Sequence, residues 1–306
     1  MINSSICAVV VTYNRKQLLM RCLEALVNQT RVPDHILIIN NASTDGTVEL
    51  LEQNGWLTNE HITLLTLSEN MGGAGGFYQG VKTVTEQGFD FVWLMDDDGY
   101  PEKNCLQELL KYCDDNSYIG PLVLDQKNKD KFCFPMRIPN SLIRLNFLSD
   151  LIENNIKNKV DGIVIPFNGI LFSTALSKKL GYPKQEYFIW GDDIEYTLRM
   201  ESNNVTIASI VNAKFYHPKE ESLGTSMMFG LLHYNDTNSQ VKLYCMCRNA
   251  VANNMRYNGF IRTCFFIIKP LWFYTFTNPS FSKLKLSVRA IWHGLTGNFS
   301  HHREYL

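Results

Sequence analysis

The sequence opens on Ile-Cys-Ala-Val-Val-Val-Thr-Tyr-Asn-Arg at residues 6–15, an apolar run that ends in a polar cluster. A short continuous apolar run of this kind predicts a strand buried on both faces of a sheet. Apolar residues then recur at 18, 19, 22, 23, 26 and 27, which is the period of a helix. The chain therefore begins with a buried strand followed by a covering helix.

The same alternation continues downstream. Apolar segments at 36–39, 62–67 and 91–95 predict three more strands, and 47–53 and 77–87 predict helices, the latter after a glycine-rich turn at 72–76. Strands are also expected at 163–165, 170–172 and 205–217, and an acidic helix start within 187–200. Residues 121–160 are polar and weakly periodic, which favours a loop region over the site. This order predicts an α/β fold with a mostly parallel sheet covered on both faces.

Polar clusters follow four of the strands, at 12–15, 40–45, 70–76 and 96–98. In parallel α/β sheets the ligand binds at the carboxyl ends of the strands. We therefore expect these four clusters to meet at one edge of the sheet and to form the functional site there.

Composition excludes several protein classes. The 306 residues have a net charge of −1, with 45% hydrophobic and 19% charged residues, which excludes a disordered chain and a collagen-like or disulfide-dense scaffold. No export signal or membrane-spanning segment is expected from the sequence. The eight cysteines are expected to be reduced and mostly buried, and Cys245-Met246-Cys247 lacks the second pair that a zinc site needs.

Asp96-Asp97-Asp98 follows the apolar segment at 91–95 directly. In an extended segment Asp96 and Asp98 project to one side and Asp97 to the other, so the outer pair suits a hard divalent cation such as Mg²⁺ or Mn²⁺. The alternative is a solvated acidic loop. The run predicts a metal site at the edge of the sheet.

Two further groups of polar residues can carry chemistry. Asp192, Asp193 and Glu195 lie at a helix start, where a carboxylate can act as general base, although they can equally serve to charge the helix N-terminus. His217 ends the last predicted strand, where it can complete a metal site or can be a structural histidine. Gly72–Gly76 permits close approach to a ligand, but it fits neither a P-loop nor a dinucleotide fingerprint.

Five of these segments together resemble the family 2 glycosyltransferases over about residues 1–220. They are Val-Val-Val-Thr-Tyr-Asn-Arg (9–15), Asn-Asn-Ala-Ser-Thr-Asp-Gly-Thr (40–47), Glu-Asn-Met-Gly-Gly-Ala-Gly-Gly-Phe (69–77), Trp-Leu-Met-Asp-Asp-Asp (93–98) and Trp-Gly-Asp-Asp-Ile-Glu-Tyr (190–196). The glycine loop and the Asp run most resemble the galactofuranosyltransferase and rhamnosyltransferase branches of bacterial surface polysaccharide synthesis, such as O-antigen or capsule.

The resemblance implies a Rossmann-like nucleotide-sugar-binding fold, the A type of glycosyltransferase fold, and inversion at the anomeric carbon. The residues that it implies for donor binding are Thr12, Asn14, Asn40, Asn41, Asn70, Gly73, Asp96 and Asp97. It implies a Mn²⁺ or Mg²⁺ site at Asp96, Asp98 and His217, and a general base at Asp193 with Asp192 beside it. Asn40 departs from the usual Asp, but an amide both donates and accepts and can still read uracil.

The expected reaction follows from these roles. The metal offsets charge on the leaving nucleotide while Asp193 takes the proton of the attacking acceptor hydroxyl. The expected donor is UDP-galactofuranose, with dTDP-rhamnose next, and the expected acceptor is a glycan or lipid-linked glycan. Two other classes stay open: a non-catalytic nucleotide-sugar-binding module, and a nucleotidyltransferase, whose basic glycine-rich loop is replaced here by Thr-Tyr-Asn-Arg.

The charge is divided unevenly along the chain. Residues 242–306 carry nine Lys or Arg and one acid, and they are rich in aromatic residues, whereas residues 1–241 carry a net charge of −9. Basic and aromatic residues together suit peripheral contact with an anionic membrane. The alternatives are a helical subdomain that completes the core and a homo-oligomer interface, while nucleic acid is disfavoured by the acidic front. We expect a catalytic domain over 1–230, a mostly helical region over 231–306, and a cytoplasmic enzyme at the inner face of the plasma membrane.

Overall fold

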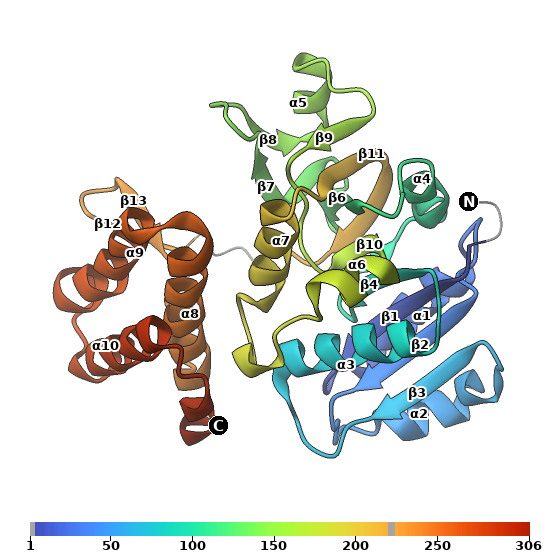
Figure 1. Cartoon of the computed structure of the whole chain (residues 1–306), viewed down its shortest axis with the longest axis horizontal. Helices are drawn as coiled ribbons and strands as arrows, with labels where there is room; N and C mark the ends of the chain where they lie inside the picture. The colour runs from blue at the N-terminus through green and yellow to red at the C-terminus, as the bar shows by residue number, and fades with distance from the viewer. Residues whose placement is uncertain (1–3, 220–223) are drawn as a thin grey trace. The chain divides into compact units, whose positions relative to one another are not determined.

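The computed structural model describes residues 4–219 and 224–306 and divides the chain into two compact units (Figure 1). Unit 1 comprises Met1–Met71, Gly76–Pro183 and Arg199–Lys219, and unit 2 comprises Gly72–Gly75, Lys184–Leu198 and Glu220–Leu306. The expected domain boundary at residue 230 stays a prediction. Each unit is described by itself below.

An eleven-stranded sheet forms the centre of unit 1. Its strands are β1 (Ile6–Thr12), β2 (His35–Asn40), β3 (Ile62–Thr66), β4 (Phe91–Asp96), β5 (Tyr100–Pro101), β6 (Ser117–Asp125), β7 (Lys131–Arg137), β8 (Arg144–Phe147), β9 (Lys159–Asp161), β10 (Asn168–Ser173) and β11 (Thr206–His217). The helices that accompany them are α1 (Lys16–Val27), α2 (Thr47–Gln53), α3 (Gly72–Glu86), α4 (Cys105–Leu110), α5 (Leu148–Glu153), α6 (Thr174–Leu180) and α7 (Asp192–Ser202). Two of these helices cross between the units, since α3 and α7 both begin in unit 2.

Parallel pairing aligns the strand ends that carry the predicted site. The strand order begins β3-β2-β1-β4, and all three pairs are parallel. The register places Thr12 opposite Asn40 and Val11 opposite Asp96. This confirms that the polar clusters after β1, β2 and β4 reach one edge of the sheet. Beyond β4, β10 pairs antiparallel with both β4 and β6, and β6 pairs parallel with β11.

Both faces of β1 are covered, as its continuous apolar run predicts. Ile6, Ala8 and Val10 belong to a buried cluster that includes the apolar face of α1. On the other face, Val9 and Val11 contact α3 at its glycines, which is why helix and strand approach closely there (Figure 1). The alternation of the two faces follows from the two-residue period of a strand.

Three local predictions from the sequence are wrong. The glycine run at 72–76 is the first part of α3 and not a turn, because a Cβ at Gly76 would lie 2.4 Å from Val11 Cγ1 and only glycine permits that packing. Residues 121–160 hold strands and not a loop region, and every residue of β6 is buried. The segment 163–165 is not a strand, since the strand of that region starts at Asn168.

Unit 2 is mostly helical in its described part. Its elements after residue 220 are the hairpin β12 (Thr225–Met227) and β13 (Leu232–Tyr234), the helices α8 (Gln240–Asn253), α9 (Phe260–Trp272) and α10 (Phe281–Thr296), and the π-helical turns η3 (Asn254–Asn258) and η4 (Phe273–Thr277). Tyr234, Leu243, Phe273 and Ala290 contribute to its buried core. None of the helices within 4–219 and 224–306 is long and apolar enough to cross a membrane. All eight cysteines are free and seven are buried, as expected.

Candidate active site

The acidic run at the end of β4 contacts side chains from β1, from the residue before α1 and from β11. Thr12 donates its hydroxyl to Asp97 Oδ2 at 2.6 Å. Arg15 Nη1 lies 3.2 Å from Asp97 Oδ1 and 2.8 Å from Asp98 Oδ2, and His217 Nε2 lies 3.1 Å from Asp98 Oδ1. Asp98 is therefore held between two cations. The expected opposite projection of Asp97 and Asp98 is wrong, because β4 ends at Asp96 and the chain turns after it.

The contacts set the protonation of these groups. Burial raises the pKa of Asp97 to about 6, although the Thr12 hydroxyl and Arg15 act to lower it. Burial lowers the pKa of His217, but Asp98 and then Cys133 together raise it more, and the pKa is about 10. Burial raises the pKa of Asp98, but the hydrogen bond and charge of His217 and the charge of Arg15 together lower it more, so it falls below its usual value. An imidazolium therefore faces an ionised carboxylate.

The carboxylates of Asp96 and Asp98 suit a divalent cation, and His217 suits one in its neutral form, because an imidazolium has no nitrogen lone pair to bind a metal. Burial, and then the neighbouring charges of Asp98 and Asp97, raise the pKa of Asp96 well above its usual value. This excess negative charge is what a bound cation relieves, and carboxylate oxygens suit Mg²⁺ and Mn²⁺. Among the residues that the structure describes, however, no three His, Cys, Asp or Glu side chains are grouped as metal ligands. Arg15 and His217 themselves supply the positive charge beside Asp98.

Four asparagines after the strands of unit 1 fix the loops next to this run. Asn41 joins two loops, since its Nδ2 donates to Asn70 Oδ1 at 3.0 Å and its Oδ1 accepts from the Met71 N–H at 2.9 Å. Asn40 Oδ1 accepts from the N–H of Ser43, and Asn14 Oδ1 accepts from the N–H of Thr44. Asn40 and Asn41 are buried. The expected donor-binding asparagines are therefore also the residues that shape the loops at this edge.

In unit 2, the expected base Asp193 follows a strained loop. The backbone has positive φ at Phe188 (65°), Trp190 (61°) and Gly191 (94°), and the two non-glycine residues are costly in that region. Asp193 Oδ1 accepts from the N–H of Ile194 at 2.8 Å and of Gly191 at 3.2 Å. Burial raises the pKa of Asp193 despite these donors, and a raised pKa makes a carboxylate a better proton acceptor.

The other acids at the start of α7 are buried. Asp192 is 5% exposed and Glu195 is fully buried. Glu195 Oε1 accepts from the Tyr257 hydroxyl at 2.7 Å and lies 3.7 Å from Lys184 Nζ. Glu195 is thus bound by side chains of its own unit, whereas Asp193 is held by backbone N–H groups.

Side chains of α8 hold the strained loop by donating hydrogen bonds to the backbone carbonyl groups of the loop. Asn249 Nδ2 lies 3.0, 3.1 and 2.6 Å from the carbonyl oxygens of Tyr187, Ile189 and Trp190. Arg248 Nη2 lies 2.9 Å from the carbonyl oxygen of Tyr187. Both side chains are fully buried. Buried donors of this kind can keep a strained backbone in place.

One turn further along α8, Asn253 makes two more hydrogen bonds to the segment before Asp193. Its Nδ2 donates to the Gly191 carbonyl at 2.8 Å, and its Oδ1 accepts from the Tyr187 hydroxyl at 2.7 Å. Sequence reasoning missed Arg248, Asn249 and Asn253. The available signal was an Arg-Asn pair that interrupts the apolar run Leu243–Val251.

The glycine loop contacts the same segment. Gly72 has φ of 69°, and a Cβ there would lie 1.9 Å from the Phe188 carbonyl oxygen, which also accepts from the Ala74 N–H at 3.1 Å. Gly73 lies between these two contacts. The close approach that glycine permits at residue 72 is therefore to the loop before Asp193.

The predicted site residues fall into two groups. Unit 1 contains Thr12, Asn14, Asn40, Asn41, Asn70, Asp96, Asp97, Asp98 and His217. Unit 2 contains Gly73, Asp192 and Asp193. The structure brings Thr12, Asp97, Asp98 and His217 into one chain of contacts through Arg15, a residue that the sequence analysis quoted but assigned no role.

Known proteins are similar to this chain in sequence or in fold. A galactofuranosyltransferase of Mycolicibacterium smegmatis, GlfT1, is 30% identical over 252 residues, which cover 80% of this chain and 81% of that protein. The dTDP-rhamnosyl transferase RfbF of Shigella flexneri is 24% identical over a region that covers 70% of this chain and 69% of that protein. The solved structure of GalNAc-T7 with UDP, GalNAc and Mn²⁺ has a TM-score of 0.63 at 12% identity, over 94% of this chain and 55% of that chain. That likeness supports the A-type glycosyltransferase fold.

The sequence profile described as "Glycosyl transferase family 2" matches residues 7–179, more than half of the chain, and spans β1, β2, β4 and the acidic run after it. The chain therefore belongs to glycosyl transferase family 2.

Proposed function

We propose that this enzyme transfers galactofuranose from UDP-galactofuranose to a glycan or lipid-linked glycan of a bacterial surface polysaccharide, with inversion at the anomeric carbon. The similarity to GlfT1 over four fifths of both chains is the observation that carries the proposal. The similarity to RfbF favours a second candidate donor, dTDP-rhamnose.

In the proposed reaction Asp193 accepts the proton of the acceptor hydroxyl. Its support is the raised pKa of the carboxyl and the N–H donors that orient Oδ1. Asp192, buried beside it, lies at the start of α7, where the helix dipole favours a carboxylate.

Donor binding is proposed for the edge of the sheet in unit 1. Asn40 and Asn41 offer amides for the base and ribose. Thr12 ends β1, where its carbonyl accepts from the Asn41 N–H, and Asn14 accepts from the Thr44 N–H in the loop that follows β2. Asn70 and Gly73 belong to the neighbouring glycine-rich stretch. A divalent cation, when held by Asp96, Asp98 and His217, would supply electrostatic stabilisation of the departing diphosphate. Asp97, fixed by Thr12 and Arg15, orients the run for both tasks.

Peripheral membrane contact through residues 242–306 is part of the proposal, as is a location at the inner face of the plasma membrane. Its support is the exposure of large apolar side chains on two basic helices. They are Phe260, Ile261, Phe265 and Ile268 on α9, and Phe281, Val288, Trp292 and Leu295 on α10. Exposed apolar side chains beside Lys and Arg suit an anionic lipid surface. The same residues can alternatively form a homo-oligomer interface.

The decisive experiment incubates the full chain with radiolabelled nucleotide sugars and a polysaccharide acceptor extract, with and without EDTA. Transfer from UDP-galactofuranose that EDTA abolishes and Mn²⁺ or Mg²⁺ restores is the expected result. Transfer from dTDP-rhamnose alone would select the second candidate, and transfer with full rate in EDTA would remove the metal from the proposal.

A variant tests the base. Asp193→Asn is expected to bind donor normally and to lose transfer by about a hundredfold or more, since general acid–base groups contribute roughly 10²–10⁴-fold. Glu201→Gln, an exposed acid on the same helix, is the matched control and should transfer normally. Near wild-type transfer by Asp193→Asn would remove Asp193 from the role.

A further inference from the structure

A cavity of about 310 Å³ in unit 2 has no part in the proposed transfer reaction. It lies between the segment that leads into α8, residues 237–240, and the first two turns of α10. Its lining includes three cationic side chains, Lys283, Lys285 and Arg289, and no acidic one. Hydroxyl and amide groups of Ser239, Asn238 and Ser282 make up part of the remaining wall.

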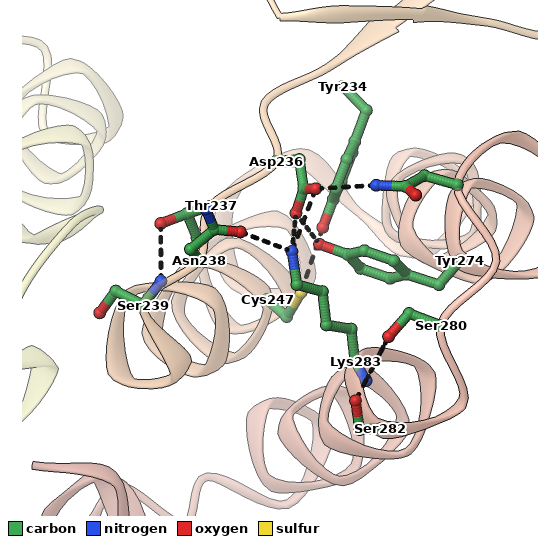
Figure 2. A network of polar contacts seen from close by, with 11 residues as sticks. Tyr234, Asp236, Thr237, Asn238, Ser239, Cys247, Tyr274, Ser280, Ser282 and Lys283 are labelled. Carbon is green, nitrogen blue, oxygen red and sulfur yellow. Dashed lines mark hydrogen bonds and ion pairs between the residues drawn. The ribbon is translucent and has the colours of Figure 1, made fainter.

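Lys283 is fixed by a polar network beside the cavity (Figure 2). Its Nζ lies 2.8 Å from Asp236 Oδ1 and 3.4 Å from Asn238 Oδ1. Asp236 Oδ1 also accepts from the hydroxyl of the buried Tyr274 at 2.7 Å. The ammonium group is thus held at the wall by groups that anchor it to the core of unit 2.

Arg289 is fixed in the same manner at the other side of the lining. Its Nη1 donates to the Tyr305 hydroxyl at 2.8 Å and lies 2.7 Å from Glu304 Oε2. Asp236 and Glu304 are the two acids of residues 224–306, a segment with nine Lys or Arg. Each acid therefore orients one cavity cation, and neither contributes to the cavity lining.

Lys285 is different, because within the described residues it makes no ion pair or hydrogen bond. It is exposed and lies on α10 between Phe281 and Val288, at spacings of four and three residues. Those spacings place it on the same helix face as the exposed apolar residues Phe281, Val288 and Trp292. The cavity therefore has one uncompensated cation, and an apolar surface continues from it along α10.

We propose that this cavity binds a phosphate group, carried by an anionic lipid or by a soluble phosphate ester. Two ammonium groups and a guanidinium on one wall match a multiply charged oxyanion, and nearby hydroxyl and amide groups can donate to its remaining oxygens. If a lipid carries the phosphate, this site is one part of the proposed membrane contact. The phosphate-site proposal is independent of which sugar donor the enzyme uses.

The test measures binding of inorganic phosphate to the full chain by calorimetry, at low ionic strength and without divalent metal. Lys285→Gln is expected to weaken binding by about tenfold, since charge-assisted hydrogen bonds of this kind dominate phosphate affinity. Because Lys285 has no partner among the described residues, the substitution leaves the fold unchanged. Lys285→Gln/Arg289→Gln should abolish measurable binding.

Arg262→Gln is the matched control, since it removes one exposed positive charge from α9, outside the cavity. Equal weakening by Arg262→Gln and Lys285→Gln would overturn the proposal, because it would show only a general effect of basic charge. Unchanged phosphate binding in Lys285→Gln would overturn it as well.

A second arm identifies the source of the phosphate through sedimentation with phosphatidic acid or phosphatidylcholine vesicles. Loss of phosphatidic acid binding in Lys285→Gln but not in Arg262→Gln would identify a lipid headgroup. Phosphate binding without vesicle binding would identify a soluble ester. Donor binding, measured with UDP on the same variants, should remain at the wild-type level, so that failure of this proposal is distinguishable from failure of the transferase proposal.

Discussion

A substitution at Asn249 tests how the structure positions the loop that precedes the proposed base, Asp193. Its amide lies within hydrogen-bond distance of three carbonyl groups of the loop before Asp193, those of Tyr187, Ile189 and Trp190. Asn249→Ala removes these contacts, and it also removes the hydrogen bond that Asn249 Oδ1 accepts from Arg248 Nε at 2.9 Å. The loop then keeps its strained residues but loses part of the support that opposes the strain.

The magnitudes of support and strain are similar. The two N–H groups of Nδ2, shared among the three carbonyls, contribute roughly 1–3 kcal/mol in total at about 0.5–1.5 kcal/mol each. Holding Phe188 and Trp190 at positive φ costs about 1–3 kcal/mol each, or roughly 2–6 kcal/mol together. Arg248 and Asn253 continue to hold the loop, so we expect the free energy of unfolding to fall by about 2 kcal/mol rather than the protein to unfold.

The assay is steady-state transfer with donor and acceptor varied separately. If only a fraction of the molecules hold the loop in its native conformation, kcat falls in proportion to that fraction. A loss of about 1.4–2.8 kcal/mol in the free energy that favours this conformation lowers kcat by about tenfold to a hundredfold. The KM for donor should change by less than about twofold, since the proposed donor residues other than Gly73 belong to unit 1. Asn249→Asp should be slower still, because an acceptor oxygen would replace the donor that faces the carbonyls.

Asn254→Ala is the matched control, since its Nδ2 donates to the Ala250 carbonyl of α8 itself and not to the loop. The reasoning is refuted if Asn249→Ala, shown to be folded by its near-ultraviolet circular dichroism, retains the kcat of Asn254→Ala. A rise of the donor KM in Asn249→Ala with an unchanged kcat would also refute this role of Asn249.

Two further predictions concern packing and pH. Gly76→Ala places a Cβ about 2.4 Å from Val11 Cγ1, and it should lower the free energy of unfolding measured in urea by about 1–3 kcal/mol. Gly88→Ala is the comparison, because a Cβ there meets no atom within 4 Å and the variant reports only the cost of positive φ. Burial raises the pKa of Asp236, but Lys283 and then Tyr274 lower it more, so that it lies below 3.8. Its contribution to stability is therefore full above the unfolded pKa and is lost as pH falls through the folded value. Asp236→Asn should thus be less stable than the wild type at about pH 6, and in thermal unfolding the difference should narrow as the pH falls below the unfolded Asp pKa of about 3.9. A difference that stays constant from pH 6 to pH 3 would contradict the ion pair.

Much of the sheet could be predicted from the sequence because β1, β2 and β4 are buried on both faces and read as continuous apolar runs. The predicted segments at 6–12, 36–39, 62–67 and 91–95 agree with β1 to β4 to within two residues. Parallel pairing then follows from the helices between them, and it brings the residues at the strand ends to one edge. The site in unit 1 could be located by this argument alone.

Other features depend on partners that are distant in sequence. β6 contains Gly120 and Pro121, which weaken a local strand signal, yet it is fully buried because β10 and β11 pair with it on either side. The glycines of α3 resemble a loop until Val9 and Val11 of β1 are known to lie against them. In both cases the tertiary contact overrides the local preference.

The sequence by itself determined the α/β class, the family and the residue types at the proposed site, because apolar periodicity and acidic or amide residues after strands are local signals. Only the tertiary structure decided how those residues are charged and held. It placed Arg15 and His217 against Asp98, and it set Asn249 of α8 beneath the strained loop before Asp193. Protonation and loop conformation depend on distances of about 3 Å between groups far apart in the chain, and such distances exist only after folding.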